Sequence, residues 1–258
     1  MEDALTTAEM ILAGFPPARV AESSKRGGDP VTEVDYEIDD ALRNLLQRPG
    51  EGWLSEETAD DLARLDHRMV WVVDPLDGTR EFIDGLPEFS VSIAAVVDGV
   101  AVVGGVTNPA ANIRVTGAMG VGVHLNGETA LKRPLVAALA ELTVLASRTE
   151  WNRGIWEPVT SSGMNVVPMG SVAYKLARVA AGLDDVTWTP VPKNEWDVAA
   201  GAALVAASGG VAVDLSGAPL QFNLENTLLE GVVATSAGAR DHVGRILALA
   251  ERQRAGKD

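Results

Sequence analysis

One short apolar run constrains the fold of this chain more than any other segment: Met69 to Val73, directly followed by Asp74-Pro75-Leu76-Asp77-Gly78. A continuous apolar run of this length predicts a strand that is buried on both faces. Pro75 cannot donate to a sheet and Gly78 tolerates unusual backbone angles, so a tight loop at the strand's end is expected to hold both aspartates. Two carboxylates that close repel each other unless one is protonated or a cation lies between them. The segment therefore indicates either a cation site or a surface turn capped by Asp.

Composition excludes several functional classes. The 258 residues are 47% hydrophobic and 22% charged, which is typical of a globular protein with one large domain or two smaller ones. A formal charge of −15 argues against binding to a nucleic-acid polymer or an anionic membrane, because both require a cationic surface. The absence of cysteine excludes disulfides, thiolate metal sites and a Cys nucleophile. An acidic N-terminus and the lack of a long apolar run lead us to expect a cytoplasmic protein.

Local patterns predict an α+β first half. We expect a weak helix over Ala8–Ala13, a loop over Ser23–Pro30 and an amphipathic helix from Thr32, where Thr32 and Asp35 match a capping box. An antiparallel meander is expected further on, with Asp-Gly and Asn-Gly turns, and its strands lie at Ser90–Val97, Val100–Thr107 and Asn112–Thr116.

The second half alternates strand and helix, which predicts an α/β arrangement. The expected strands are Leu142–Ala146, Val166–Met169, Val186–Thr189, Val211–Leu215 and Val232–Thr235, and the expected helices are Val172–Ala181, Asp197–Ser208 and Arg240–Arg254. We therefore divide the chain into residues 1–133 and 134–258, with the junction near Lys132–Pro134 and the two halves packed closely.

Other acids have ordinary explanations when each is taken alone. Asp197 follows Trp196 at the start of a helix rich in Ala and Gly, where the helix dipole favours a first-turn acid. Glu56-Glu57 is most simply a solvated pair, and Asp35 is the capping partner of Thr32.

Taken together and in order, these motifs resemble the inositol monophosphatase superfamily of metal-dependent phosphomonoesterases. The similarity extends from about Lys25 to the C-terminal helix, through Asp29-Pro30-Val31-Thr32-Glu33-Val34-Asp35, Glu56, Asp74 to Thr79, and Asp197. The resemblance implies a layered αβαβα sandwich of the sugar-phosphatase type. Its first domain would carry most metal ligands, and its second domain would supply Asp197 and the substrate contacts.

The same resemblance implies the catalytic residues. Two or three Mg²⁺ ions would be bound by Glu56, Asp74, the carbonyl of Leu76, Asp77 and Asp197. Oxygen-only ligands suit this hard cation, and paired metals activate a water and stabilise a leaving oxygen. Thr79 would orient the water with Asp35 behind it, Glu57 would assist, and Gly78 and Thr79 would offer backbone N–H groups to the phosphate.

For the substrate, the segments Glu81-Phe82-Ile83 and Asn194-Glu195-Trp196-Asp197 look more like the CysQ-type bisphosphate nucleotidase branch. That resemblance makes 3′-phosphoadenosine 5′-phosphate the expected substrate, with contacts from Ser147, Arg148, Gly170, Ser171 and Lys175. Glu150 stands where this branch commonly has His. Lys175 could instead be a snorkelling helix residue and Arg148 a surface ion-pair partner.

Alternatives remain open. Thr189-Pro190-Val191-Pro192 supplies no acid where inositol phosphatases have one, which argues against inositol monophosphate, although this ester and histidinol phosphate stay possible within the same chemistry. A non-catalytic homologue that binds only metal or ligand is the alternative from another class. The resemblance also implies a small phosphorylated metabolite as partner, a homodimer and inhibition by lithium.

Overall fold

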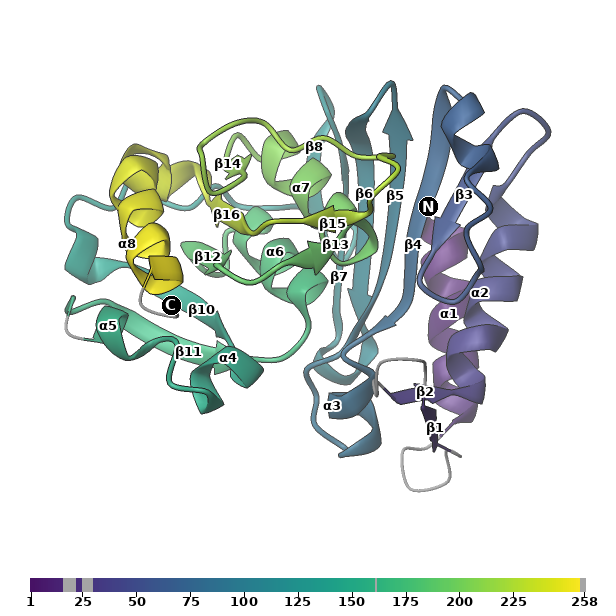
Figure 1. Cartoon of the computed structure of the whole chain (residues 1–258), viewed down its shortest axis with the longest axis horizontal. Helices are drawn as coiled ribbons and strands as arrows, with labels where there is room; N and C mark the ends of the chain where they lie inside the picture. Colours follow the sequence, from purple (N-terminus) through teal and green to yellow (C-terminus); the bar gives the residue numbers. More distant parts are fainter. Residues whose placement is uncertain (16–21, 25–29, 161, 256–258) are drawn as a thin grey trace.

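Alternating layers of helix and sheet form the molecule. The computed structural model describes residues 1–15, 22–24, 30–160 and 162–255. On one side, α1 (Glu2–Gly14) and α2 (Glu33–Leu46) cover a seven-stranded sheet, and α6 (Val172–Ala180) and α7 (Glu195–Ala207) lie between that sheet and a five-stranded one (Figure 1). The outer face of the second sheet is covered by α8 (Val243–Ala255). This order confirms the predicted αβαβα sandwich.

The seven-stranded sheet follows chain order. Its strands are β3 (Gly52–Ser55), β4 (Met69–Asp77), β5 (Ser90–Val97), β6 (Val100–Asn108), β7 (Ile113–Ala118), β8 (Gly122–Leu125) and β9 (Glu128–Thr129). Only the β3–β4 pair is parallel, so the predicted antiparallel meander is confirmed. Asp98, Gly99, Asn126 and Gly127 all have positive φ, as tight hairpin turns of the Asp-Gly and Asn-Gly type require.

The five-stranded sheet is mixed. It contains β10 (Thr143–Ser147), β11 (Asn165–Met169), β12 (Val186–Thr189), β14 (Val211–Val213) and β16 (Val232–Thr235), in the spatial order β11-β10-β12-β16-β14. All the strands predicted for this half are present, each with bounds that differ by at most a few residues. The last helix begins later than expected, because a 3₁₀ segment occupies Ala237–His242 before α8.

Short elements were missed by sequence patterns, since few residues define each of them. They are β1 (Glu22–Ser24), β2 (Pro30–Thr32), α3 (Thr79–Ile83), α4 (Arg148–Asn152), α5 (Glu157–Thr160), β13 (Lys193–Asn194) and β15 (Leu228–Leu229). The predicted loop over Ser23–Pro30 is wrong at its ends, because β1 and β2 pair antiparallel there. Residues 25–29, which include Lys25 and Asp29 of the motifs above, lie outside the described residues.

β4 is buried on both faces, as its apolar run predicts. Val70 and Val72 belong to the core beneath α6 and α7, whereas Val73 belongs to the core beneath α1 and α2. The strand does not end at Val73, because its pairing with β5 resumes after an irregularity between Asp74 and Asp77. The acidic segment is therefore a bulged continuation of the strand rather than a separate loop.

Two glycines let α7 approach its neighbours closely. A Cβ on Gly104 of β6 would lie 2.3 Å from the carbonyl oxygen of Ala200, and one on Gly201 would lie 2.2 Å from the Cβ of Leu176 in α6. Larger side chains at these positions would separate α7 from both neighbours. The Ala- and Gly-rich sequence thus permits this close approach, which fixes where α7 and its first-turn Asp197 lie.

No helix among the described residues is long and apolar enough to cross a bilayer. The division into two domains near Lys132–Pro134 stays a prediction.

Candidate active site

Three acids from distant parts of the chain meet at one end of the central helices. Glu56 follows β3, Asp74 lies in β4, and Asp197 is in the first turn of α7. One carboxylate oxygen from each of these residues lies within 4.8 Å of the others. The parallel pairing of β3 with β4 accounts for part of this geometry, because the Glu56 N–H donates to the Val73 carbonyl beside Asp74.

The electrostatics of this cluster are those expected of a cation site. Burial raises the pKa of Asp74 well above its usual range, and the charges of Glu56, Asp77 and Asp197 raise it further. Burial and the charges of Asp77 and Glu56 raise the pKa of Asp197 to about 8. Among the described residues, no Lys or Arg lies within ion-pair distance of Asp74 or Asp197. Clustered carboxylates of this kind fit a hard divalent cation such as Mg²⁺.

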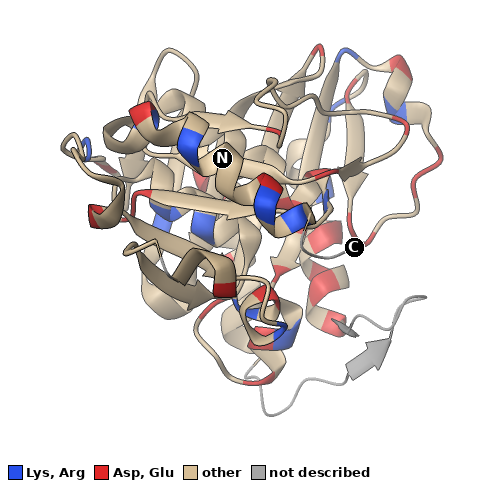
Figure 2. Cartoon of the chain, turned by 60° about the vertical axis from the view of Figure 1, so that its left-hand side comes forward, with Lys and Arg blue, Asp and Glu red and all other residues tan. Residues whose placement is uncertain are grey.

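Charge alone does not distinguish this place on the molecule. Asp and Glu occur on many helices and loops, with Lys and Arg between them (Figure 2). The cluster stands out because Asp74 is only 1% exposed and shares a cavity of about 320 Å³ with Glu56 and Asp197.

Asp77, also predicted as a ligand, is held by hydrogen bonds from the start of α6. Its Oδ2 accepts hydrogen bonds from the Ser171 hydroxyl at 2.8 Å and from the Ala173 N–H at 2.6 Å, both at the N-terminus of α6. Asp77 lines the same cavity but is not one of the three acids that meet within 4.8 Å. Both of these hydrogen bonds go to Oδ2, which leaves Oδ1 available as a metal ligand.

The turn between Asp74 and Thr79 is tightly determined. The Leu76 N–H donates to Asp74 Oδ1 at 3.0 Å, and the Leu76 carbonyl accepts from the Thr79 hydroxyl at 3.0 Å. Gly78 has a φ of +95°, and a Cβ there would lie 2.9 Å from the Glu88 carbonyl oxygen. Glycine is therefore required at this position for both backbone angle and space.

Asp35 makes both of the contacts that its sequence context suggested. Its Oδ2 accepts from the N–H and hydroxyl of Thr32 at the start of α2, and its Oδ1 lies 3.2 Å from the Thr79 hydroxyl. The carboxylate is 1% exposed. The capping interaction thus fixes the acid that faces Thr79, so the two interpretations are compatible.

Glu57 lies less centrally than Glu56. It is half-buried, its N–H donates to the Ser55 hydroxyl, and it is not among the residues that line the 320 Å³ cavity. Its assisting catalytic role stays a prediction.

The residues predicted to contact a nucleotide are largely engaged within the protein. The Arg148 guanidinium pairs with both carboxylate oxygens of Glu88, and the same carboxylate accepts from the Gly170 N–H at 2.8 Å. Lys175 is 4% exposed, and its ammonium donates to backbone carbonyls. Ser147 caps α4 through the Glu150 N–H. All five predicted residues, Ser171 included, line a second cavity of about 140 Å³, which Asp77 also lines.

Sequence patterns missed basic residues at the site, among them Lys193 and Arg153. Lys193, in β13, lines both cavities, and Arg153, at the end of α4, lines the larger one. The Lys193 ammonium lies 3.8 Å from a carboxylate oxygen of Glu150, which also accepts from Trp156 and Thr189. The position of Lys193 four residues before Asp197 was the available signal, since β13 leads directly into α7.

Comparison with known proteins assigns the family. The model of the inositol monophosphatase family matches residues 1–255. The chain belongs to this family. Inositol-1-monophosphatase SuhB of Mycobacterium tuberculosis is 37% identical over 202 residues, which are 73% of this chain and 69% of the relative. The family resemblance expected from the motifs is therefore confirmed, and the chain is a phosphatase of a metal-dependent family.

Solved structures of family members share the fold. The extragenic suppressor protein suhB of Bartonella henselae has a TM-score of 0.81 and 27% identity, over 96% of each chain. CysQ of Bacteroides thetaiotaomicron has a TM-score of 0.72 and 27% identity, over 92% of this chain and 95% of CysQ. The relatives named as inositol monophosphatases support the substrate that the sequence placed second better than they support the expected nucleotide.

Proposed function

We propose that this chain is a Mg²⁺-dependent phosphomonoesterase that hydrolyses an inositol monophosphate. The observation that carries the proposal is the meeting of Glu56, Asp74 and Asp197 beside the Asp35–Thr79 pair. A module that only binds a ligand needs no hydroxyl held by a buried carboxylate next to its cation site. This pair therefore favours a catalyst over a non-catalytic homologue.

Mg²⁺ would be held by the carboxylates of Glu56, Asp74 and Asp197, with the unengaged oxygen of Asp77 and the Leu76 carbonyl completing the ligands. When bound, it would lower the pKa of a water molecule and stabilise charge on the phosphate and leaving oxygens.

Thr79 and Asp35 would orient the attacking water. The Thr79 hydroxyl has one proton and two acceptors within reach, the Leu76 carbonyl oxygen at 3.0 Å and Asp35 Oδ1 at 3.2 Å, so its oxygen can accept a hydrogen bond from water whichever of them takes the proton. Asp35 is held in place by Thr32, so this acceptor is positioned before substrate arrives. The phosphate would lie against the N–H groups of Gly78 and Thr79 at the start of α3.

Thr79→Ala is expected to lower kcat by about 10²-fold, the lower end of what a positioned proton-transfer partner contributes. KM should change little, because the hydroxyl is assigned to the water rather than to the substrate. Steady-state phosphate release measures both constants. Thr129→Ala, which removes an exposed threonine hydroxyl far from the cluster, is the matched control and should behave as wild type. An unchanged kcat in Thr79→Ala would remove the hydroxyl from the mechanism.

A bisphosphate nucleotide is the second candidate substrate, and the CysQ likeness favours it. A second phosphate needs unengaged cationic groups. Arg148 is occupied by Glu88 and Lys175 by backbone carbonyls, so these two residues give less support to a second phosphate than their sequence positions suggested. Inositol monophosphate has one phosphate group, so it needs no second set of cationic groups. Its usual acidic contact is missing from Thr189–Pro192, so Thr149, Lys193 and Asn194 on the cavity wall would meet its hydroxyl groups instead.

Phosphate release in the presence of Mg²⁺ separates the candidates. With inositol 1-phosphate, 3′-phosphoadenosine 5′-phosphate and histidinol phosphate compared at equal concentrations, we expect kcat/KM to be at least about 10-fold higher for the inositol ester, which corresponds to about 1.4 kcal/mol. A preference of that size for the bisphosphate would reverse the order of the two candidates. No hydrolysis of any ester, with Mg²⁺ still bound, would support the non-catalytic alternative.

Three further expectations come from the family resemblance and stay predictions: a homodimer, inhibition by lithium, and a small phosphorylated metabolite as partner.

A further inference from the structure

Lys175 is a buried cation whose partners are all backbone carbonyls. Its Nζ donates to the carbonyls of Met169 and Gly170, each at 3.3 Å, and of Ser171 at 2.7 Å. The side chain is 4% exposed, and among the described residues no carboxylate lies within ion-pair distance of it. An ammonium group has three protons, and all three are used here. Lys175 is therefore fully occupied in holding one segment of backbone.

That segment is the turn from β11 into α6, and its conformation is unfavourable without support. Ser171 has a φ of +53°, which non-glycine residues adopt rarely. Gly170 has no room for a side chain, since a Cβ there would lie 2.7 Å from both Glu81 and the Glu88 carbonyl oxygen. Three carbonyls that point toward one ammonium group repel one another when it is absent. The conformation of the turn thus depends on Lys175.

The same turn holds Asp77. The Ser171 hydroxyl lies 2.8 Å from Asp77 Oδ2, 2.9 Å from the Ser90 hydroxyl and 3.0 Å from the Tyr174 N–H. Because a carboxylate only accepts, Ser171 must give its single proton to Asp77, and Ser90 must donate to Ser171. The Ala173 N–H is the second donor to the same Asp77 oxygen. Both contacts lose their direction if Ser171 leaves its positive-φ conformation.

We propose that Lys175 is a positioning residue for the metal site, which holds the turn so that Ser171 and Ala173 direct the free carboxylate oxygen of Asp77 toward Glu56, Asp74 and Asp197. This inference rests on the proposed metal-dependent function. It gives Lys175 a role different from the substrate contact that its sequence position suggested. Removing a group behind a metal ligand typically weakens metal binding by about 10- to 100-fold.

Lys175→Met tests the proposal, because Met keeps the apolar stem and removes the ammonium group. The probe is Mn²⁺ alone, titrated into the full chain without substrate and followed by electron paramagnetic resonance. We expect the Kd for Mn²⁺ to rise by about 10-fold. In phosphate-release assays, the Mg²⁺ concentration for half-maximal activity should rise similarly, while KM for the ester at saturating Mg²⁺ changes less than about 2-fold.

A direct contact with substrate gives the opposite pattern: an unchanged Kd for Mn²⁺ and a higher KM. That result, or no change in either constant, would overturn the proposal. Because Mn²⁺ binding needs no turnover, a wild-type chain that binds Mn²⁺ but releases no phosphate contradicts the proposed function and leaves the Lys175 test intact.

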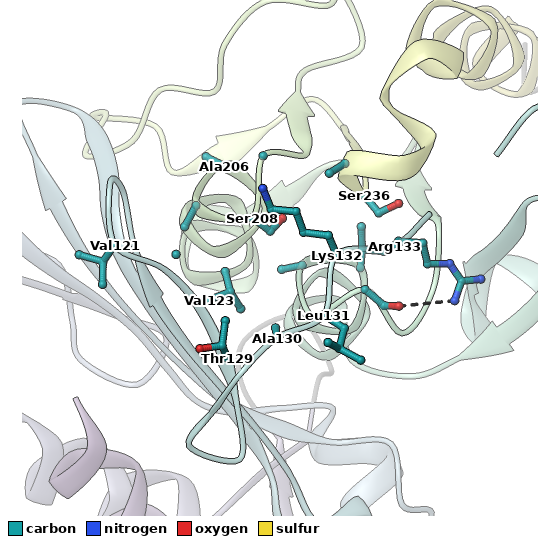
Figure 3. Close-up of a pocket in the computed structure, with 17 residues that line it drawn as sticks. Val121, Val123, Thr129, Ala130, Leu131, Lys132, Arg133, Ala206, Ser208 and Ser236 are labelled. Carbon is teal, nitrogen blue, oxygen red and sulfur yellow. Dashed lines mark hydrogen bonds between the residues drawn. The ribbon is translucent and has the colours of Figure 1, made fainter. Parts of the chain in front are cut away.

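Lys132→Met is the matched control, since it makes the same change in charge at the other end of the same helices. Lys132 lines a separate cavity of about 400 Å³ where α6 and α7 end, together with Ser208 and Ser236 (Figure 3). The Lys132→Met variant should bind Mn²⁺ with the Kd of the wild-type chain.

Ser171→Ala keeps the proposal testable if Lys175→Met does not fold. It removes one hydroxyl group, and the Kd for Mn²⁺ should rise by about 10-fold or more for the loss of a hydrogen bond to a charged group. Adding Lys175→Met to Ser171→Ala should weaken binding by less than the product of the two single effects, since both act through one turn. A full product would show that Lys175 acts independently of Ser171.

Discussion

Asp74→Asn is expected to lower kcat for phosphate release by about 10³-fold, which corresponds to about 4 kcal/mol of transition-state stabilisation. Asp74 is the most buried acid of the cluster and is flanked by Glu56, Asp77 and Asp197. The amide keeps the shape and can still accept the Leu76 N–H, so the fold should persist. What the variant loses is a negative charge at the centre of the cation site. The expected readout is a large fall in kcat together with a Kd for Mg²⁺ raised by at least about 10-fold.

Asp40→Asn is the matched control for this substitution. Asp40 is an exposed acid on α2, so the change in net charge is identical, and both constants should equal those of wild type. Calorimetric titration with Mg²⁺ measures the binding, and a melting curve verifies folding. If Asp74→Asn retained wild-type kcat and Mg²⁺ affinity, the cluster could not be the catalytic metal site.

The metal-free protein is expected to lose stability as the pH rises from 6 to 8. Burial and the charges of Asp77 and Glu56 raise the pKa of Asp197 from 3.8 to about 8 in the folded chain. Between these values the folded state keeps a proton that the unfolded chain has released, so the free energy of unfolding falls as the pH rises. Each pKa unit corresponds to about 1.4 kcal/mol, so about 2 to 3 kcal/mol should be lost between pH 6 and pH 8. For a chain of this length that lowers Tm by about 5 °C or more.

Mg²⁺ should reverse this trend, because a cation removes the cost of ionising the acids. Melting curves in EDTA and in Mg²⁺ at both pH values test it, and the increase in Tm on adding Mg²⁺ should be larger at pH 8. Asp197→Asn supplies the comparison, since the variant has no carboxyl group at this position and its metal-free Tm should depend less on pH. A wild-type Tm in EDTA that is equal at the two pH values would contradict the proton linkage.

Local sequence patterns correctly predicted the helices and strands that depend mainly on neighbouring residues. The helix from Thr32 and its capping by Asp35 depend on neighbouring residues, and both are present. The strand Met69–Val73 follows from its apolar run, although the strand continues through Asp77 because β5 supplies pairing partners that the run itself does not reveal.

Side-chain partners were harder to predict, because they come from elements far apart in the sequence. Arg148 lines the smaller cavity, but its pairing with Glu88 depends on how α4 meets the segment before β5. Lys175 was interpreted as a phosphate contact because its sequence position matches one in a related branch. Its ammonium group instead donates to backbone carbonyls of a turn in which Ser171 has a positive φ, and no residue pattern indicates that conformation.

The cluster joins Glu56 and Asp74 on the first sheet to Asp197 on a helix that is translated much later. While the ribosome is still adding the second sheet, the nascent chain presents the early acids without the residue that completes their coordination shell. A chain truncated before α7 would therefore gain less stability from magnesium than the full chain, because it lacks the Asp197 carboxylate.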